Sequence, residues 1–168
     1  MAFFFGLDKI FGQSEQNTEH IKQEKGIIGK YIENDFPVIV RFINELPGKK
    51  VVNKFPLLVV VSWKYNGEKN NGMPEKKINE RMIGLESLIE RSLQASNAFT
   101  HAYSRTGNNL KEFVYYGTSQ KEFMDLLNKT LAKHEEYPIE INFYDDKEWV
   151  EFKKLIDDFS FTSKIPRS

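Results

Sequence analysis

The sequence predicts an α+β domain with an antiparallel sheet, and three observations lead to this prediction. Several short segments are rich in β-branched and aromatic residues, or alternate between apolar and polar side chains, which is typical of strands. Other segments repeat apolar residues at intervals of three and four, which is typical of amphipathic helices. The two kinds of segment are interleaved along a chain of 168 residues, a length suited to one domain.

The first half of the chain contains two strand patterns and one helix pattern. Residues 36–43 (FPVIVRFI) are β-branched and aromatic, and they end at the turn residues 45–48 (ELPG). Residues 55–65 (FPLLVVVSWKY) start with a continuous apolar run, which predicts a central strand covered on both faces. After a loop rich in Asn and Gly, the apolar residues of 74–95 recur at helical spacing, so we expect an amphipathic helix there.

A hairpin and a second helix follow. Residues 98–105 and 110–116 have strand patterns, and the loop between them, residues 106–109 (TGNN), has Gly and Asn where a tight turn needs positive φ. Ser119 and Glu122 have the spacing of a capping box in front of apolar residues at helical intervals. We therefore expect a β-hairpin followed by a helix that begins after Ser119.

A strand and a helix close the predicted domain. Residues 138–144 alternate apolar and polar side chains, which predicts a half-buried strand. Asp145 and Glu148 repeat the capping-box spacing before Trp149 and the apolar residues that follow it. These residues predict a final helix.

The order of these elements indicates a particular fold. From residue 55 to residue 144 the order is strand, helix, strand, strand, helix, strand, which is the split βαβ or ferredoxin-like arrangement. The sequence therefore predicts a ferredoxin-like βαββαβ core, with an antiparallel sheet and helices on one face. Residues 36–43 would add an extra N-terminal edge strand, and the last segment would add a C-terminal helix.

The two ends differ in composition from this core. Residues 1–25 begin with an apolar segment (MAFFFGLDKIFG) and continue as a polar linker, so we place a single domain at residues 26–160 and a tail at 161–168. The apolar segment predicts a short helix that either covers the domain's own core or meets a membrane interface or a partner. Asp8 and Lys9 interrupt it, unlike a secretory signal, and no run of ~20 apolar residues predicts a membrane span. We expect a cytoplasmic protein.

Composition and spacing argue against most catalytic and cofactor chemistry. The chain has 24 basic and 24 acidic residues, and hence no net charge to attract a polyanion such as nucleic acid. It has no cysteine, which excludes a disulfide scaffold, a thiolate nucleophile and a cysteine-ligated metal. The three histidines, His20, His101 and His134, show no metal-site spacing. We therefore expect no enzyme, no metal and no cofactor.

Local charge is more informative, because acidic residues gather near the C-terminus. Between residues 135 and 158 there are nine acids and three lysines, a net charge of −6 that would steer a basic protein partner. The predicted partner-binding surface, with an aromatic anchor, consists of Glu135, Glu136, Asp145, Asp146, Glu148, Trp149 and Glu151. Helix capping, a Mg²⁺ cluster or a solvated helix face would also explain some of these acids.

A second candidate surface is the open face of the predicted sheet. By strand alternation, five residues suited to stacking on RNA bases or on a small ligand share one face. They are His101, Tyr103, Arg105, Phe113 and Tyr115. Burial in the core, or cover by the N-terminal segment, would explain the same residues. A third hypothesis, ranked last, is a small enzyme that uses Arg41, His101 and the carboxylates.

Several motifs, taken together, carry a resemblance to a known family. They are Asn44-Glu45-Leu46-Pro47, Phe55-Pro56-Leu57, Ser62-Trp63-Lys64-Tyr65, Asn71-Gly72-Met73-Pro74, Phe113-Val114-Tyr115-Tyr116, Tyr137-Pro138-Ile139-Glu140-Ile141 and Asp146-Lys147-Glu148-Trp149. With them, residues 36–159 resemble an uncharacterised bacterial family, domain-of-unknown-function family 695. The resemblance implies no catalytic residues, because the family has no established activity. It implies an architecture similar to ferredoxin-like proteins that regulate a ribonuclease by binding it.

The chain also resembles, in type and not in motif, the immunity proteins of contact-dependent growth inhibition, which neutralise a toxin domain from a neighbouring cell. We therefore expect a non-catalytic protein-binding module. Its most concrete form is an immunity protein or inhibitor that occludes the active site of a basic, nuclease-type toxin. The alternative is an RNA-binding or small-ligand-binding domain that uses the open sheet face.

Overall fold

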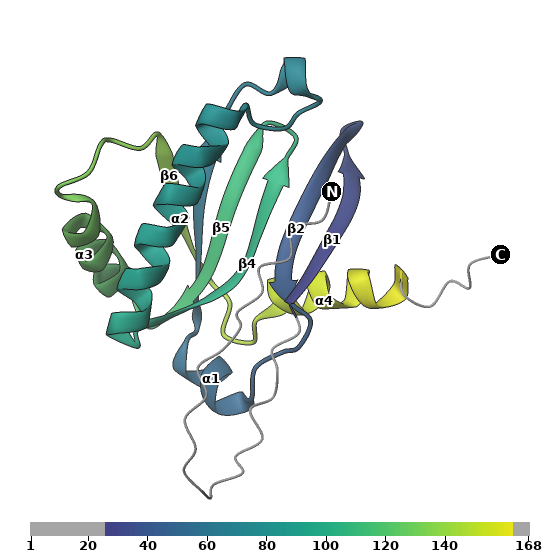
Figure 1. Ribbon diagram of the computed structural model, residues 1–168. Coiled ribbons are helices and arrows are strands. Elements are labelled where there is room, and N and C mark those ends of the chain that lie inside the picture. The colour runs from purple at the N-terminus through teal and green to yellow at the C-terminus, as the bar shows by residue number, and fades with distance from the viewer. Residues whose placement is uncertain (1–25, 163–168) are drawn as a thin grey trace, which may run out of the picture.

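A computed structural model of the chain describes residues 26–162, in which six strands form one sheet (Figure 1). The strands are β1 (Gly26–Glu33), β2 (Phe36–Ile43), β3 (Leu57–Lys64), β4 (Phe99–Gly107), β5 (Leu110–Gly117) and β6 (Ile139–Asp145). The helices are α1 (Lys49–Lys54), α2 (Lys76–Ser96), α3 (Gln120–Leu131) and α4 (Val150–Thr162), with a short 3-10 helix at Glu68–Asn70. The N-terminal segment expected in residues 1–25, and residues 163–168 of the expected tail, lie outside the described range.

The sheet is antiparallel throughout. Its strands follow the order β1-β2-β4-β5-β3-β6, and every neighbouring pair runs antiparallel. β3, the strand with the continuous apolar run, lies between β5 and β6 as predicted for a central strand. The α+β class with an antiparallel sheet is therefore confirmed.

One of the two edge strands of the sheet is β1, which the sequence analysis did not predict. β1 pairs with β2 over its whole length, and Asn34 and Asp35 join the two strands with φ values of 50° and 67°. Two consecutive positive φ values form a tight turn whose twist suits a hairpin. The edge position predicted for residues 36–43 is wrong, because β1 pairs with the outer side of this strand and β4 with the other.

The hairpin of β4 and β5 has the predicted turn and an unpredicted bulge. Asn108 and Asn109 have positive φ values of 49° and 61°, as expected for this loop. Within β4, the pairing with β5 shifts register between His101 and Tyr103, which places a β-bulge at Ala102. A bulge changes which side chains face each side of a sheet, and here it separates His101 from Tyr103.

Two hydrophobic clusters, one on each face of the sheet, hold the helices. On the first face α2 and α3 pack against β3 and β5, with Met82, Phe113 and Phe123 among the buried residues. On the second face α1 and α4 pack against β2, β4 and β5, with Val52 and Phe152 among the buried residues. The expectation that helices lie on one face therefore describes α2 and α3, whereas α1 and α4 occupy the other face.

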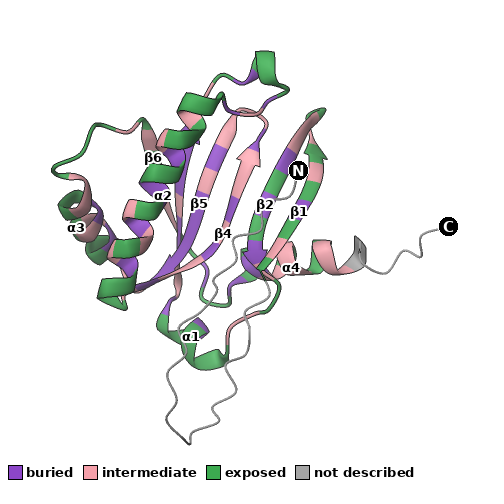
Figure 2. Ribbon diagram, viewed as in Figure 1, coloured by how far each residue is buried: buried purple, intermediate pink, exposed green. Residues whose placement is uncertain are grey.

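The helices cover different parts of the two faces. On the face turned toward the viewer in Figure 2, α2 and α3 lie beside β5 and β6, and β1 and β2 have exposed residues with no helix over them. On the first face the β1 and β2 side chains are left open, and Ile28 and Ile32 are 74 % and 65 % exposed. On the second face Phe159 of α4 packs on Tyr31 and Phe42 of these same strands. Because α4 extends toward β1 and β2, it leaves the part of the second face formed by β3 and β6 less covered.

Replacing two glycines by alanine should change the stability of the domain in opposite directions. Gly107, with φ 145°, pairs with Val38, and a Cβ atom here would collide with the Pro37 carbonyl oxygen. We expect Gly107→Ala to lower the free energy of unfolding by ~1–3 kcal/mol because of this backbone strain. Gly84 lies in α2 with open space around it, so Gly84→Ala should raise the same quantity by ~0.5–1 kcal/mol. Urea unfolding of both variants measures the difference, and destabilisation by both would contradict it.

Candidate functional site

The predicted acidic surface is divided by β6. Glu135 and Glu136 precede this strand, whereas Asp145 is its last residue and the other predicted residues follow it. A strand of seven residues spans roughly 20 Å, so the two groups lie at opposite ends of β6. Glu135 is also engaged with Arg81 of α2, whose guanidinium donates to both carboxylate oxygens at 3.1 and 3.0 Å. The prediction that all seven residues form one surface is therefore wrong.

Trp149 is a core residue and not an anchor for a partner. Its side chain is 1 % exposed and stacks on Tyr116 with the ring centroids 3.9 Å apart. The indole N–H donates to the Phe55 carbonyl oxygen at 2.8 Å. Trp149 precedes α4 with a positive φ of 55°, which directs its side chain into the core of the second face. The predicted role of Trp149 in partner binding is wrong because a partner has no access to it.

Asp146 caps α4, one residue later than the predicted cap. Its carboxylate accepts hydrogen bonds from the backbone N–H groups of Val150 and Glu151 at 2.7 and 3.1 Å. It also accepts the hydroxyl of Tyr116 at 2.6 Å. Burial, followed by this hydrogen bond, raises the pKa of Tyr116 well above its usual value. The capping interpretation of the acids is thus right for Asp146, which is only 8 % exposed.

Two of the predicted acids that remain accessible, Asp145 and Glu151, line a groove of about 560 Å³ on the second face. Leu58 and Val60 of β3 supply apolar lining, and Tyr144, 53 % exposed, supplies an aromatic side chain. Among the described residues, nine line this groove, and they include four acids and no base. Asp145 and Glu151 are its exposed acids. This surface is named the acidic groove below.

The five residues of the predicted sheet face do not share a face. Phe113 and Tyr115 are fully buried beneath α2 and α3, and His101 lies on the same side. Tyr103 packs on Phe152 in the other core, because the bulge at Ala102 interrupts the strict alternation that the prediction assumed. Arg105 lies beside Glu33, with 2.5 Å between Nη2 and Oε2. The predicted stacking surface is therefore wrong.

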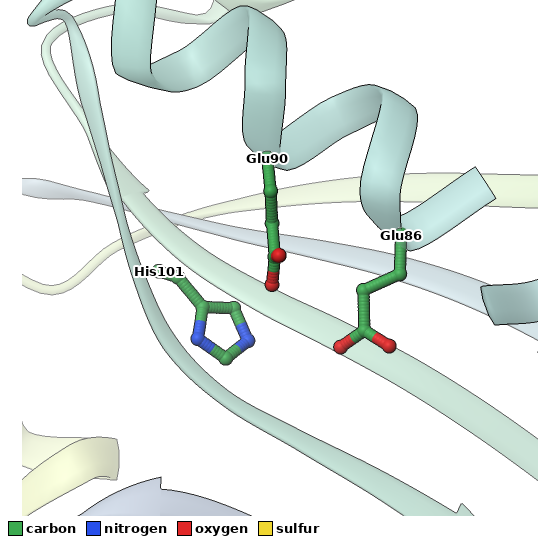
Figure 3. Close-up of side chains that lie close together, drawn as sticks. All are labelled: Glu86, Glu90 and His101. Carbon is green, nitrogen blue, oxygen red and sulfur yellow. The ribbon is translucent and has the colours of Figure 1, made fainter. Parts of the chain in front are cut away.

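The structure instead brings His101 beneath two carboxylates of α2, Glu86 and Glu90 (Figure 3). One ligand atom from each of the three side chains lies within 4.8 Å of the others. Two basic side chains join them: Arg41 Nη2 of β2 is 2.7 Å from Glu86 Oε1, and Lys111 Nζ of β5 is 3.8 Å from Glu86 Oε2. This group of five residues is named the His101 cluster below. Arg41 and His101 of the third hypothesis thus lie in one cluster, but its carboxylates are Glu86 and Glu90 and not the acids near the C-terminus.

Two polar atoms at this cluster have no hydrogen-bond partner in residues 26–162. They are His101 Nε2 and the Tyr115 hydroxyl, both shielded from solvent. A neutral imidazole has one protonated and one unprotonated nitrogen. The shielded Nε2 is therefore either an unpaired donor or an unpaired acceptor.

Burial sets the protonation of the cluster. It lowers the pKa of His101 to about 4, with Glu86 opposing the shift and Arg41 and Lys111 adding to it. Burial, together with the charge of Glu86, raises the pKa of Glu90. His101 is therefore neutral at pH 7. A neutral imidazole nitrogen beside two carboxyl groups can accept a proton or bind a cation.

Sequence reasoning missed Glu86 and Glu90, although a signal was present. Met82, Leu85 and Ile89 form the buried stripe of α2, and Glu86 falls within this stripe and is 6 % exposed. An acid on the apolar face of a helix must meet a partner, because burying an unpaired charge is costly. Glu90 follows one turn later on the same side. The position of His101 relative to them depends on the sheet order, which the sequence alone does not provide.

Comparison with known proteins identifies the family of the chain. A family model described as "Family of unknown function (DUF695)" matches residues 31–156, so the chain belongs to this family. The chain matches no curated protein and no solved structure. Within residues 26–162, no helix is both long enough and apolar enough to cross a membrane.

The buried position of Trp149 gives a first prediction for this region. Trp149→Ala should lower the free energy of unfolding by ~3–5 kcal/mol, because it removes a stacked ring and leaves the Phe55 carbonyl without its donor. The neighbouring Val150 is 45 % exposed, so Val150→Ala should change stability by less than ~0.5 kcal/mol. Denaturant unfolding of both variants is the measurement. Similar effects from the two substitutions would mean that Trp149 is not a core residue.

The low pKa of His101 gives a second prediction. In an NMR titration its ring signals should stay unchanged from pH 8 to about pH 5 and move only as the pH approaches 4. The unfolded chain has the ordinary value of 6.5, so the folded state binds fewer protons between these two values. Stability that depends on neutral His101 is therefore present above pH 6.5 and is lost as the pH falls toward 4. Loss of one set of ring signals in His101→Asn assigns the resonance, and titration near pH 6.5 would contradict the buried position.

Proposed function

We propose that this protein is a non-catalytic binding module that recognises a basic protein partner through the acidic groove. Its most concrete form is an immunity protein or inhibitor that neutralises a nuclease-type toxin by occluding the toxin's active site. The observation that carries the proposal is the composition of the groove, whose described lining combines two exposed acids, Asp145 and Glu151, with apolar and aromatic side chains and no base.

The groove has the chemistry that a basic protein loop would need. Leu58 and Val60 can cover the aliphatic part of a lysine or arginine side chain, while Asp145 faces its charge. Glu151 accepts a hydrogen bond from Lys154 at 2.7 Å, and a basic partner would replace this exposed lysine. Tyr144 adds an exposed aromatic ring of the kind that contributes strongly to interfaces. Active sites of nucleases are basic because they bind phosphates, so an acidic surface competes with the nucleic acid for them.

The strand order supports the finer description of the fold. β4-β5-β3-β6, with α2 and α3 against one face, has the order expected for a split βαβ core. We propose that these four strands form a ferredoxin-like unit, to which β1, β2, α1 and α4 are added. In this unit the helices occupy the first face, and the second face is left available for the acidic groove.

The test is capture of a partner by the full-length chain from a lysate of its source cells. The triple variant Asp145→Lys, Glu148→Lys and Glu151→Lys reverses exposed charges in and beside the groove. We expect the wild-type chain to retain a basic protein at 1:1 stoichiometry and to inhibit its nuclease activity. The triple variant should lose at least about 1.4 kcal/mol of binding free energy, a tenfold loss of affinity, because each reversal replaces attraction by repulsion.

A charge-matched control separates the groove from total charge. Glu68→Lys, Glu75→Lys and Glu80→Lys reverse three exposed acids near the start of α2, outside the groove. This control should bind the partner with nearly wild-type affinity at 150 mM salt. Equal binding by both triple variants would overturn the groove as the binding surface. Retention of nucleic acid in place of a basic protein would overturn the function.

A further inference from the structure

We propose that Glu86, Glu90 and His101 form a binding site for a divalent first-row transition ion. The inference does not depend on the proposed function, because the His101 cluster lies beneath α2 and the acidic groove lies on the opposite face. It rests on three converging ligand atoms, on two unpartnered polar atoms beside them, and on a cavity that leads to the cluster.

The first argument is the donor set. Two carboxylate oxygens and one imidazole nitrogen lie within 4.8 Å of one another, and ligand atoms of a bound ion are about 3 Å apart, so small side-chain rotations suffice. Mixed oxygen and nitrogen donors suit Zn²⁺, Mn²⁺ and Fe²⁺ better than Mg²⁺ or Ca²⁺, which prefer oxygen alone.

The second argument is the unpartnered ring nitrogen of His101. Its Nε2 is shielded from solvent and has no hydrogen-bond partner in the described chain. Carboxylate oxygens only accept hydrogen bonds, so their convergence on a ring nitrogen favours a proton or a cation between them.

Tyr115 provides an independent observation. Its side chain is 0 % exposed, and its hydroxyl also has no hydrogen-bond partner in residues 26–162. The ring lies 5.4 Å from that of His101, measured between centroids, and Glu86 and Glu90 both act electrostatically on the hydroxyl. A buried hydroxyl left unpaired is unusual in a folded protein, and a water bound to an ion in the cluster would satisfy it.

The two basic residues do not block the site. Arg41 contacts one oxygen of Glu86, but 56 % of its side chain is exposed, so it can move into solvent. Lys111 lies 3.8 Å from the other oxygen, too far for a close hydrogen bond, and it offsets part of the carboxylate charge. Arg41 is thus a competitor of the ion for Glu86, and removing its charge should strengthen metal binding.

The cluster is also accessible from the surface. Glu90 and His101 both line an open cavity of about 410 Å³, next to the end of α2. His101 also lines a second cavity of about 400 Å³, together with Thr100 and Ile43. An ion can therefore enter without unfolding of the domain, as a metal site requires.

The test is titration of the EDTA-treated full-length chain with Zn²⁺ by calorimetry, and with Mn²⁺ by electron paramagnetic resonance. We expect one ion per chain and a rise in Tm on addition of Zn²⁺. Glu90→Gln and His101→Ala should each weaken Zn²⁺ binding by about tenfold or more. Arg41→Gln should strengthen it by about threefold or more, because it removes a positive charge near the ion.

Matched controls exclude binding elsewhere on the chain. Glu80→Gln changes an exposed acid of α2, and a double variant of His20→Ala and His134→Ala removes the two histidines outside the cluster. Both should bind Zn²⁺ like the wild-type chain. Thermal unfolding without metal confirms that each variant is folded, and if His101→Ala is not, the isosteric Glu90→Gln decides. Absence of saturable binding would mean that a proton occupies the cluster, and it would overturn the proposal, as would binding abolished only by the double variant.

Discussion

The β-bulge at Ala102 is the local constraint on which both candidate surfaces depend. Ala102 and Tyr103 both belong to the core of the second face, whereas His101 and Ser104 lie on the first face. Without the extra residue, strict alternation would place His101 and Tyr103 on one side of the sheet. The bulge therefore delivers an imidazole to the carboxylates of α2 and, two residues later, a tyrosine to the acidic groove. The irregular strand β4 thus contributes a side chain to each of the two candidate surfaces.

The strands and helices with strong periodicity could be predicted from the sequence, and the irregular positions could not. The apolar run of β3, the stripe of α2 and the Asn-Asn turn follow from local preferences that tertiary structure does not reverse. β1 has glycines at positions 26 and 29, which weaken a strand pattern, and Gly29 is needed because Phe159 packs where its side chain would be. The bulge at Ala102 leaves no local pattern at all, because it depends on pairing with β5.

The difference between local sequence patterns and tertiary structure also explains why several predicted binding residues are structural. The sequence indicates Asp146 and Trp149 as partner-binding residues because one is an acid and the other a large aromatic residue. In the structure they instead fix the start of α4 through contacts with Tyr116 and Phe55. The same residue types serve binding sites and helix packing, because buried hydrogen bonds and large aromatic rings also hold a helix against a sheet. Charge and residue type alone do not separate a structural acid from an accessible one. The sheet order and the exposure of each side chain are required for that.

The His101 cluster is costly to fold, even though Arg41 and Lys111 offset the charge of Glu86. Glu86 and Lys111 are both nearly buried, and removing charged groups from water usually costs more than their attraction returns. An apolar residue at position 86 would continue the stripe of Met82, Leu85 and Ile89 at lower cost. Stability therefore does not account for an acid there. All five residues of the cluster fall within the family match at residues 31–156, whereas exposed Ile28 lies outside it. The proposed metal site therefore lies wholly within the matched domain.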